Sequence, residues 1–137
     1  SGAYKNLSLL RRRAICSWSC AFRVAHSKFT NPAPERNYWI YFECPEFTSL
    51  CPITNQPDFA KITIKYIPNQ LCVESKSLKL YLFSFRNFGA FHEEAVNRIL
   101  NDFVKAAHPR RAIITGSFNP RGGISITIVA EYPEPKL

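Results

Sequence analysis

Cys51 and Asp58, seven positions apart, are residues of this chain that could carry out chemistry together. Cys51 stands between Leu50 and Pro52, and the three prolines of segment 45–58 predict an irregular loop around it. An unassisted thiol has a pKa of about 8.5, so only a few per cent of it is thiolate at neutral pH. A nearby carboxylate can accept the thiol proton during nucleophilic attack. Many cysteines are simply small buried side chains, but the neighbouring carboxylate favours a nucleophile here.

The segment 74–81, Glu-Ser-Lys-Ser-Leu-Lys-Leu-Tyr, concentrates polar groups at the start of a predicted helix. Its first six residues hold one carboxylate, two hydroxyls and two ammonium groups. The carboxylate can accept hydrogen bonds from a polar heterocycle, and the lysines can bind an anionic cofactor.

Two further pairs stand at the expected ends of elements: His92 and Glu93 begin a second predicted helix, and Arg121 and Gly122 lie in a predicted turn. By residue type alone, two interpretations of His92 and Glu93 are equally good. One gives the pair a functional role, and the other makes it a solvated imidazole beside an acid that complements the helix dipole. In the turn, the arginine can attract phosphate, and the glycine lets a backbone N–H approach closely. No Gly-x-Gly-x-x-Gly occurs in the sequence, which argues against a Rossmann-type site.

Hydrophobic periodicity predicts the elements that position these residues. Ala60, Ile62, Ile64 and Tyr66 alternate with polar residues, as in a half-buried strand. The predicted order is β-β-α-α-β-β, an α+β domain with a four-stranded antiparallel sheet and both helices on one face. Strands are expected at 38–44, 59–66, 111–118 and 124–131, with a loop at 45–58 and a hairpin turn at 119–123. The first helix is expected to start at an N-cap of Ser75 or Ser77, and the second to bury Phe91, Ala95, Ile99, Phe103 and Ala106.

Length and charge indicate one domain with a basic N-terminal arm. The net charge of +8 is uneven, because residues 1–30 hold six basic and no acidic groups, whereas residues 31–137 hold twelve basic and ten acidic groups. The proline-marked segment 31–36, Asn-Pro-Ala-Pro-Glu-Arg, is a joint, so residues 1–36 are separated as an arm from a domain at 37–137. Such an arm could contact nucleic acid or a membrane surface. A solvated or partner-docked arm is favoured, and no direct nucleic-acid contact is expected because the body is nearly neutral.

Five cysteines, at positions 16, 20, 44, 51 and 72, indicate a reduced chain. Their number is odd and they form no Cys-x-x-Cys pair, so no metal site is expected. No apolar run approaches the roughly 18 residues that span a bilayer. We therefore expect a cytoplasmic protein. The start, Ser-Gly-Ala at 1–3, resembles a cleavage remnant or an edited start.

Four motifs resemble the QueF family of NADPH-dependent nitrile reductases, which convert 7-cyano-7-deazaguanine to its aminomethyl form for tRNA queuosine. They are Phe-Thr-Ser-Leu-Cys-Pro at 47–52 with Asp58 beyond it, segment 74–81, Phe-His-Glu-Glu at 91–94 and Pro-Arg-Gly-Gly at 120–123. The resemblance covers roughly residues 37 to 128. It implies the tunnelling fold, whose element order agrees with the order predicted from periodicity.

The resemblance also implies a role for each candidate residue. Cys51 is expected to form a covalent thioimide with the nitrile, and Asp58 is expected to be the proton donor. The expected substrate contacts are Val73, Glu74, Ser75, His92 and Glu93. The expected contacts with the cofactor NADPH are Ser75, Lys76, Arg121 and Gly122.

Assembly into a ring is the last expectation. The resemblance implies a homodecamer of two stacked pentamers. Independently, the strands carry more apolar surface than two helices can cover on one face, and open sheet edges invite pairing with another chain. The substrate pocket is then expected at a subunit boundary. The residues behind this expectation are Tyr38, Ile40, Phe42, Ile62, Ile64 and the run 124–129.

Other functions stay open. A related amidinotransferase of archaeal tRNA modification would share Cys51 and Asp58 without needing NADPH, and the intact segment 74–81 favours the reductase. Zinc-using relatives of the same fold are disfavoured because their Cys/His ligand spacing is absent. A basic nucleic-acid-binding module is disfavoured because the aromatic residues lie largely at core periodicity.

Overall fold

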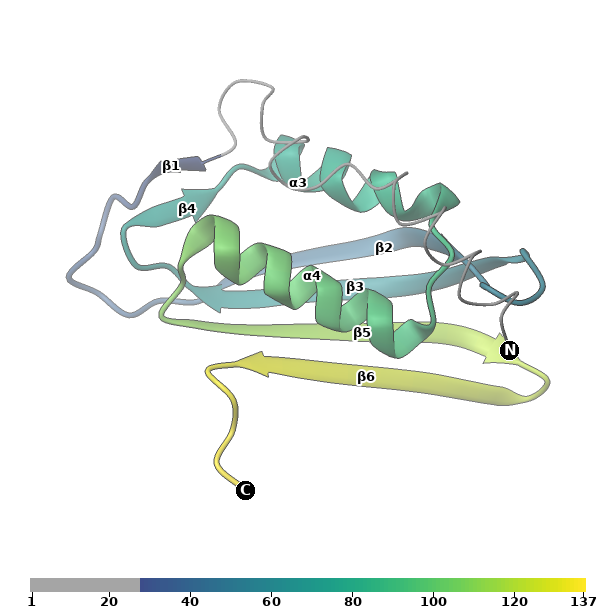
Figure 1. Ribbon diagram of the computed structural model, residues 1–137. Coiled ribbons are helices and arrows are strands. Elements are labelled where there is room, and N and C mark those ends of the chain that lie inside the picture. Colours follow the sequence, from purple (N-terminus) through teal and green to yellow (C-terminus); the bar gives the residue numbers. More distant parts are fainter. Residues whose placement is uncertain (1–27) are drawn as a thin grey trace.

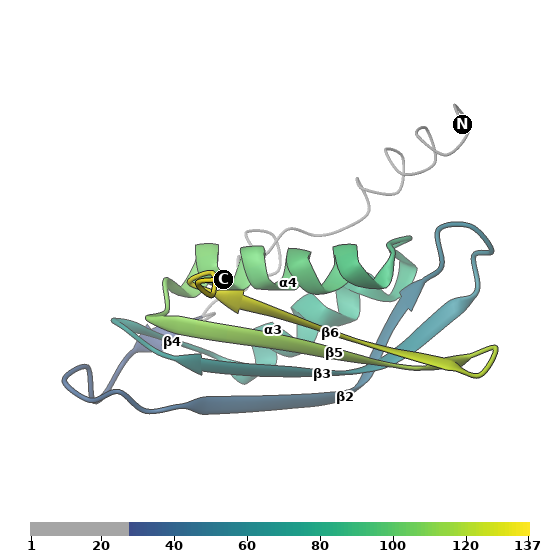
Figure 2. The same ribbon diagram turned by 90° about the horizontal axis from the view of Figure 1, so that it is seen from below.

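The computed structural model describes residues 28–137, which form a four-stranded antiparallel sheet with two helices on one face (Figure 1, Figure 2). The strand order is β2-β3-β5-β6, and β1 and β4 form a separate two-stranded sheet. The elements are β1 (Lys28–Thr30), β2 (Ile40–Leu50), β3 (Pro57–Ile67), β4 (Leu71–Val73), α3 (Ser75–Phe83), the 3-10 helix η1 (Ser84–Asn87), α4 (His92–Ala107), β5 (Arg111–Arg121) and β6 (Ile124–Tyr132). The predicted α+β class and the order of the main elements are confirmed.

Strand β3 carries the core of the domain and one candidate site residue in a single row. Ile62, Ile64 and Tyr66 have no exposed surface, and Asp58 begins the same row at 5% exposure. Because side chains alternate between the two faces of a strand, the pattern that buries the apolar residues also turns Asp58 toward the helices. The strand predicted at 59–66 is confirmed and is slightly longer than expected.

Strand β2 is longer than the sequence predicts. Instead of ending within 38–44, it continues through Pro45 to Leu50, so the prediction of an irregular loop over all of 45–58 is wrong. Its register with β3 shifts beside this proline, and β2 is an edge strand. A bulge and an edge are the two settings in which a sheet tolerates proline. The loop therefore shrinks to residues 51–56.

Helix α3 begins at a different N-cap from the one predicted. The choice of Ser75 or Ser77 is wrong, because the carboxylate of Glu74 accepts hydrogen bonds from the backbone N–H groups of Lys76 at 2.9 Å and Ser77 at 3.0 Å. A carboxylate in this position satisfies two helix-end donors and also complements the helix dipole.

Helix α4 buries the predicted face along its middle. Ala95, Ile99 and Phe103 have no exposed surface. The prediction is wrong at the first residue, because Phe91 is the N-cap and is 53% exposed, whereas Ala106 is partly buried and packs against the core. The buried stripe nevertheless holds the first turn of α4 against the sheet, which positions the residues that follow Phe91.

The helices cover more of the sheet than expected. Ile62 and Ile64 are fully buried within one chain. The prediction that these two residues contribute apolar surface that only a ring of subunits could cover is therefore wrong. Exposed apolar surface remains on the edge strand β6, where Ile124 is 75% and Val129 is 56% exposed. In residues 28–137, no helix has both the length and the apolar character that a membrane crossing needs.

The first described residues are attached to the body of the domain. Strand β1 pairs antiparallel with β4, with Lys28 opposite Val73. The side chain of Asn31, 2% exposed, donates a hydrogen bond to the carbonyl of Asn69 at 2.7 Å. Residues 1–27, which hold most of the predicted basic arm, lie outside the described residues.

Candidate active site

Cys51 lies in the tight loop between β2 and β3, at the end of the sheet where α4 begins (Figure 1). Its backbone N–H donates to the carbonyl of Gln56 at 2.8 Å, and its own carbonyl accepts from the N–H of Asn55 at 2.9 Å. The preceding residue, Leu50, donates its N–H to the carbonyl of Phe88 at 2.9 Å. These bonds fix the cysteine loop against the segment that precedes α4.

The surroundings of Cys51 favour its thiolate. Its pKa lies below the ordinary value, first because the hydroxyl of Thr54 donates a hydrogen bond to the sulfur, and then because the backbone N–H groups of Thr54 and Ile53 do the same. Partial burial and the negative charge of Asp58 oppose this lowering. In strand β2, by contrast, burial raises the pKa of Cys44. Cys51 is therefore the better nucleophile of the two at neutral pH.

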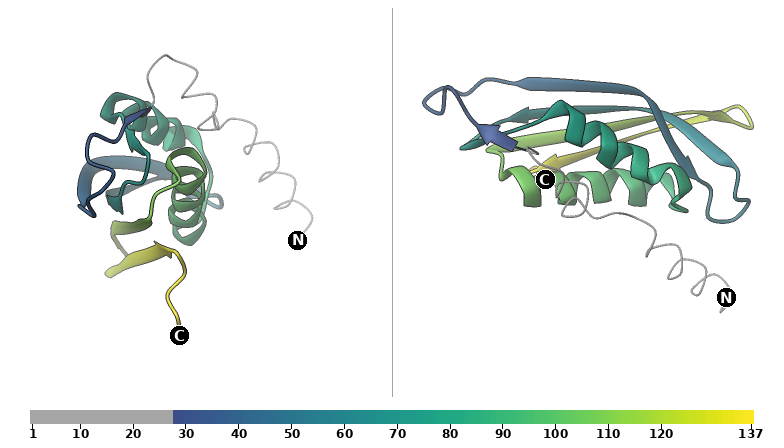
Figure 3. Two further views of the ribbon diagram at one scale, coloured as in Figure 1. Left: turned by 90° about the vertical axis from the view of Figure 1, so that its left-hand side faces the viewer. Right: turned by 90° about the horizontal axis from the view of Figure 1, so that it is seen from above.

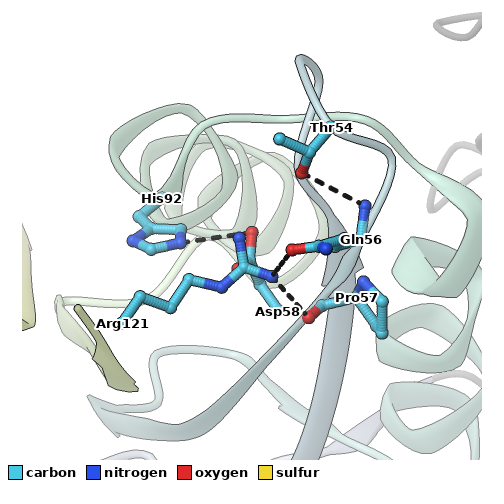
Figure 4. A network of polar contacts seen from close by, with 6 residues as sticks. All are labelled: Thr54, Gln56, Pro57, Asp58, His92 and Arg121. Atoms are coloured by element: carbon cyan, nitrogen blue, oxygen red, sulfur yellow. Dashed lines mark hydrogen bonds and ion pairs between the residues drawn. The ribbon is translucent and has the colours of Figure 1, made fainter.

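Asp58 is a buried carboxylate held between an arginine and a histidine (Figure 4). Its Oδ1 lies 3.0 Å from Nε of Arg121, and its Oδ2 lies 3.3 Å from Nε2 of His92. A carboxylate this far from water needs such partners to compensate its lost hydration. Side chains from β3, the start of α4 and the end of β5 thus meet at one point.

His92 is oriented by an aromatic neighbour. Its ring stacks on Phe118, with ring centroids 3.9 Å apart and planes inclined by 8°, and this arrangement directs Nε2 at Asp58. The pairing of His92 with Asp58 is not among the sequence predictions. A signal for it existed, because the alternation that buries Ala60 and Ile62 also buries Asp58, and a buried carboxylate requires a partner.

Arg121 reaches the cysteine loop from the β5–β6 hairpin. Its Nη2 donates to the carbonyl of Pro57 at 3.1 Å and to the side-chain oxygen of Gln56 at 3.5 Å. The hairpin turn itself consists of Gly122 and Gly123, with φ of 58° and 78°. Both lie in the left-handed region that glycine adopts most easily. A Cβ at either position would meet no atom within 4 Å, so the requirement is conformational.

The segment 73–76 lies at the opposite end of the sheet (Figure 3). Val73 donates its N–H to the hydroxyl of Tyr66 at 3.0 Å, near the end of β3. Asp58 lies eight residues before Tyr66 on β3. At the usual rise per residue, Asp58 and Tyr66 are therefore about 26 Å apart along the strand. The structure groups Cys51, Asp58, His92 and Arg121, with Glu93 and Gly122 as their chain neighbours, and it places Val73, Glu74, Ser75 and Lys76 elsewhere.

The carboxylate of Glu74 is engaged within its own chain. The hydrogen bond from the N–H of Lys76, followed by those from Ser77, lowers the pKa of Glu74, although desolvation opposes the change. The side chains of Ser75 and Lys76 are exposed. Segment 74–76 therefore presents one hydroxyl and one ammonium group to solvent beside a carboxylate that already caps a helix.

A groove of about 870 Å³ runs between the edge strand β2 and helix α3. Its lining includes Ser75, the basic residues Lys79 and Arg86, and apolar residues such as Phe42 and Leu82. Neither the cysteine loop nor the buried carboxylate lines it. The groove has the size of a small-molecule site, but within one chain it is separate from the reactive cluster. In residues 28–137, no group of three or more His, Cys, Asp or Glu side chains could hold a metal ion.

Residues 57–137 match the family described as QueF-like protein. The chain belongs to this family, and the matched region contains both the buried carboxylate with its two partners and the segment 74–81.

Named relatives are similar over nearly all of the chain. A protein of Bacteroides thetaiotaomicron is 57% identical over 129 residues, which cover 94% of this chain and 85% of that protein. A protein of Porphyromonas gingivalis is 61% identical over 131 residues, covering 96% of this chain and 84% of that protein. Both are named NADPH-dependent 7-cyano-7-deazaguanine reductase.

A solved structure supports the fold. The crystal structure of the archaeosine synthase QueF-Like in the apo form matches with a TM-score of 0.67, covering 72% of this chain and 96% of that chain. At 22% identity, the match shows the fold alone. The predicted tunnelling fold is confirmed.

Proposed function

We propose that this protein reduces 7-cyano-7-deazaguanine to 7-aminomethyl-7-deazaguanine with NADPH, a step in making queuosine for tRNA. Its relatives at 57% and 61% identity carry the name of this activity. The observation within this chain that carries the proposal is Cys51, a thiol with a lowered pKa near the buried carboxylate of Asp58. A nitrile carbon is a soft, weak electrophile, and a thiolate is a suitable nucleophile for it.

The first step of the proposed reaction forms one bond and loses no atom. The sulfur of Cys51 bonds to the nitrile carbon, one π bond of the C≡N group opens, and the nitrogen gains a proton, which gives a thioimide. Asp58 accepts the thiol proton and delivers it to the nitrogen. The burial of Asp58 limits access of bulk water to this proton transfer.

The later steps return the thiol to its starting state. NADPH held by the proposed cofactor contacts would supply a hydride for each of the two reductions, and the conversion of nitrile to amine takes up two protons in addition. Between the two reductions, Cys51 leaves as a thiolate when the first reduced adduct collapses to an imine. The oxidised cofactor must therefore leave and a second NADPH must bind while the intermediate stays in the site. This requirement favours a deep substrate pocket beside a shallower cofactor groove.

The remaining predicted residues have roles in recognition. Glu93, exposed on the first turn of α4, can accept two hydrogen bonds from the guanine-like N–H edge of the substrate. The other proposed substrate contacts are Val73, Glu74, Ser75 and His92. The proposed cofactor contacts are Ser75, Lys76, Arg121 and Gly122, and the exposed cations among them fit the phosphates of NADPH.

The separation of these contacts supports a site built from two chains. Both the substrate set and the cofactor set are divided between the two ends of the sheet, and Asp58 lies about 26 Å along β3 from the strand end that holds Val73. A head-to-tail ring would bring the reactive end of one chain to segment 73–76 of the next. We propose that this ring is a pentamer and that two pentamers stack into a homodecamer.

A free thiol at Cys51 also fits a reducing, cytoplasmic compartment. Cys44, Cys51 and Cys72 are all free within residues 28–137. Because disulfides are rare in the cytoplasm, a reaction that depends on an unpaired thiol suits that location.

The proposal is tested by measuring NADPH oxidation by the full chain in the presence of 7-cyano-7-deazaguanine. We expect two NADPH consumed per nitrile, with the aminomethyl product identified by mass. An amidinotransferase would form the thioimide but consume no NADPH. Conversion of the nitrile without oxidation of NADPH would therefore overturn the reductase proposal and favour that alternative.

A further inference from the structure

The guanidinium of Arg121 is turned inward, onto the loop that carries the proposed nucleophile (Figure 4). Its Nε contacts Oδ1 of Asp58 at 3.0 Å, and its Nη2 donates to the carbonyl of Pro57 at 3.1 Å and to the side chain of Gln56 at 3.5 Å. These contacts engage the guanidinium with its own chain. The β5–β6 hairpin is thereby tied to the β2–β3 loop through one side chain.

Each of the two carboxylate oxygens of Asp58 contacts a different side chain. Arg121 holds Oδ1 and His92 holds Oδ2, so the plane of the carboxylate is fixed from both sides. Asp58 is 5% exposed, while the side chain of Arg121 is 42% exposed. Removing Arg121 would leave one buried carboxylate oxygen without its charged partner, and the carboxylate would be free to rotate about its remaining contact.

We propose that Arg121 is a positioning residue for Asp58 in the covalent step, before any cofactor takes part. This role rests on the proposed function and adds to the cofactor contact proposed above. In that step Asp58 begins and ends as a carboxylate: it takes the proton from the sulfur of Cys51, and gives it to the nitrile nitrogen as the S–C bond forms. The fixed planar donors of Arg121 set the orientation of the carboxylate for this transfer.

The test measures formation of the thioimide without NADPH, by intact mass of the full chain mixed with 7-cyano-7-deazaguanine over time. Arg121→Ala should form the adduct about ten-fold more slowly or worse, since positioned proton transfer contributes about 10²–10⁴ in rate. Arg121→Lys should recover part of the loss. Arg111→Ala is the matched control, because Arg111 pairs with Glu131 at 3.6 Å at the other end of the same strand, and its adduct rate should not change.

A double-mutant cycle separates action through Asp58 from general damage to the fold. In an Asp58→Asn background, Arg121→Ala should cause little further loss, because residues that act as one unit are not additive. An Arg121→Ala rate equal to wild type, or losses that multiply in the double variant, would overturn the positioning role. If the wild-type chain formed no adduct, the covalent mechanism in the proposed function would fail first, and the positioning role would fail with it.

Discussion

The two ends of the sheet in this protein use their polar residues in different ways. At the end with the cysteine loop, Asp58 contacts both His92 and Arg121, so its charge is compensated within one chain. At the other end, the carboxylate of Glu74 caps a helix while Lys76 faces solvent. The first arrangement is complete enough for acid–base chemistry. The second presents polar groups to solvent, and under the proposed function it acts on a ligand held by a neighbouring chain.

The largest expected effect is at the nucleophile. Cys51→Ala should abolish the covalent adduct with 7-cyano-7-deazaguanine, because Cys51 is the one cysteine within residues 28–137 that lies in the loop beside Asp58. Cys44→Ala is the matched control and should retain the adduct, since burial raises the pKa of Cys44 and keeps it a thiol. Peptide mapping after incubation without NADPH checks both. An adduct that maps to Cys44 or Cys72 would contradict the assignment.

The next effect separates the substrate from the cofactor. Glu93→Ala should weaken substrate binding by a factor on the order of hundreds, because donors on the base would be buried without an acceptor. Binding of NADPH should change little. Lys76→Ala should show the reverse pattern and discriminate less between NADPH and NADH. Calorimetric titration of each variant with each ligand measures this, and equal losses for both ligands would show that the two sets of contacts have been misassigned.

Mixed assemblies test whether the two ends belong to one site. Chains carrying Cys51→Ala and chains carrying Lys76→Ala are defective at opposite ends, so co-refolding them should restore about a quarter of the wild-type activity if sites form head to tail at random. Cys51→Ala mixed with Glu93→Ala should restore nothing, because both changes lie at the same end. Recovery with Glu93→Ala but not with Lys76→Ala would contradict the proposed arrangement, because it would place Cys51 and Glu93 of one site on different chains. Light scattering should show a large oligomer, and a stable active monomer would also contradict it.

Local periodicity predicted the parts of the site that lie on regular elements. The alternation through Ile62 and Ile64 located β3, and the apolar stripe of α4 placed His92 in a first helical turn. The same alternation could have shown that Asp58 is buried. Its partner Arg121 could not be found in this way, because that contact depends on how two hairpins meet and not on either pattern alone.

Two local misreadings have a common physical origin. Serine is a stronger N-cap by type than glutamate, yet Glu74 caps α3 because its longer side chain reaches two backbone donors. Proline usually ends a strand, yet Pro45 lies in β2 because the strand is at an edge and bulged. Both outcomes depend on tertiary setting. The family resemblance supplied the expected roles of residues at the two ends, which no spacing in the sequence could connect.

The smallest expected effect concerns how the thiol is activated. Thr54→Val removes the hydroxyl that donates to the sulfur of Cys51, so the pKa of Cys51 should rise toward its ordinary value. Less thiolate is then present at pH 7, and alkylation of Cys51 by iodoacetamide should slow by about three- to ten-fold, the value of one hydrogen bond. The difference should shrink as the pH rises above both pKa values, where wild type and variant are equally ionised. Thr54→Ser keeps the hydroxyl and should alkylate like wild type. A Thr54→Val rate that is unchanged across the whole pH range would mean that the backbone N–H groups of Thr54 and Ile53 suffice to activate the thiol.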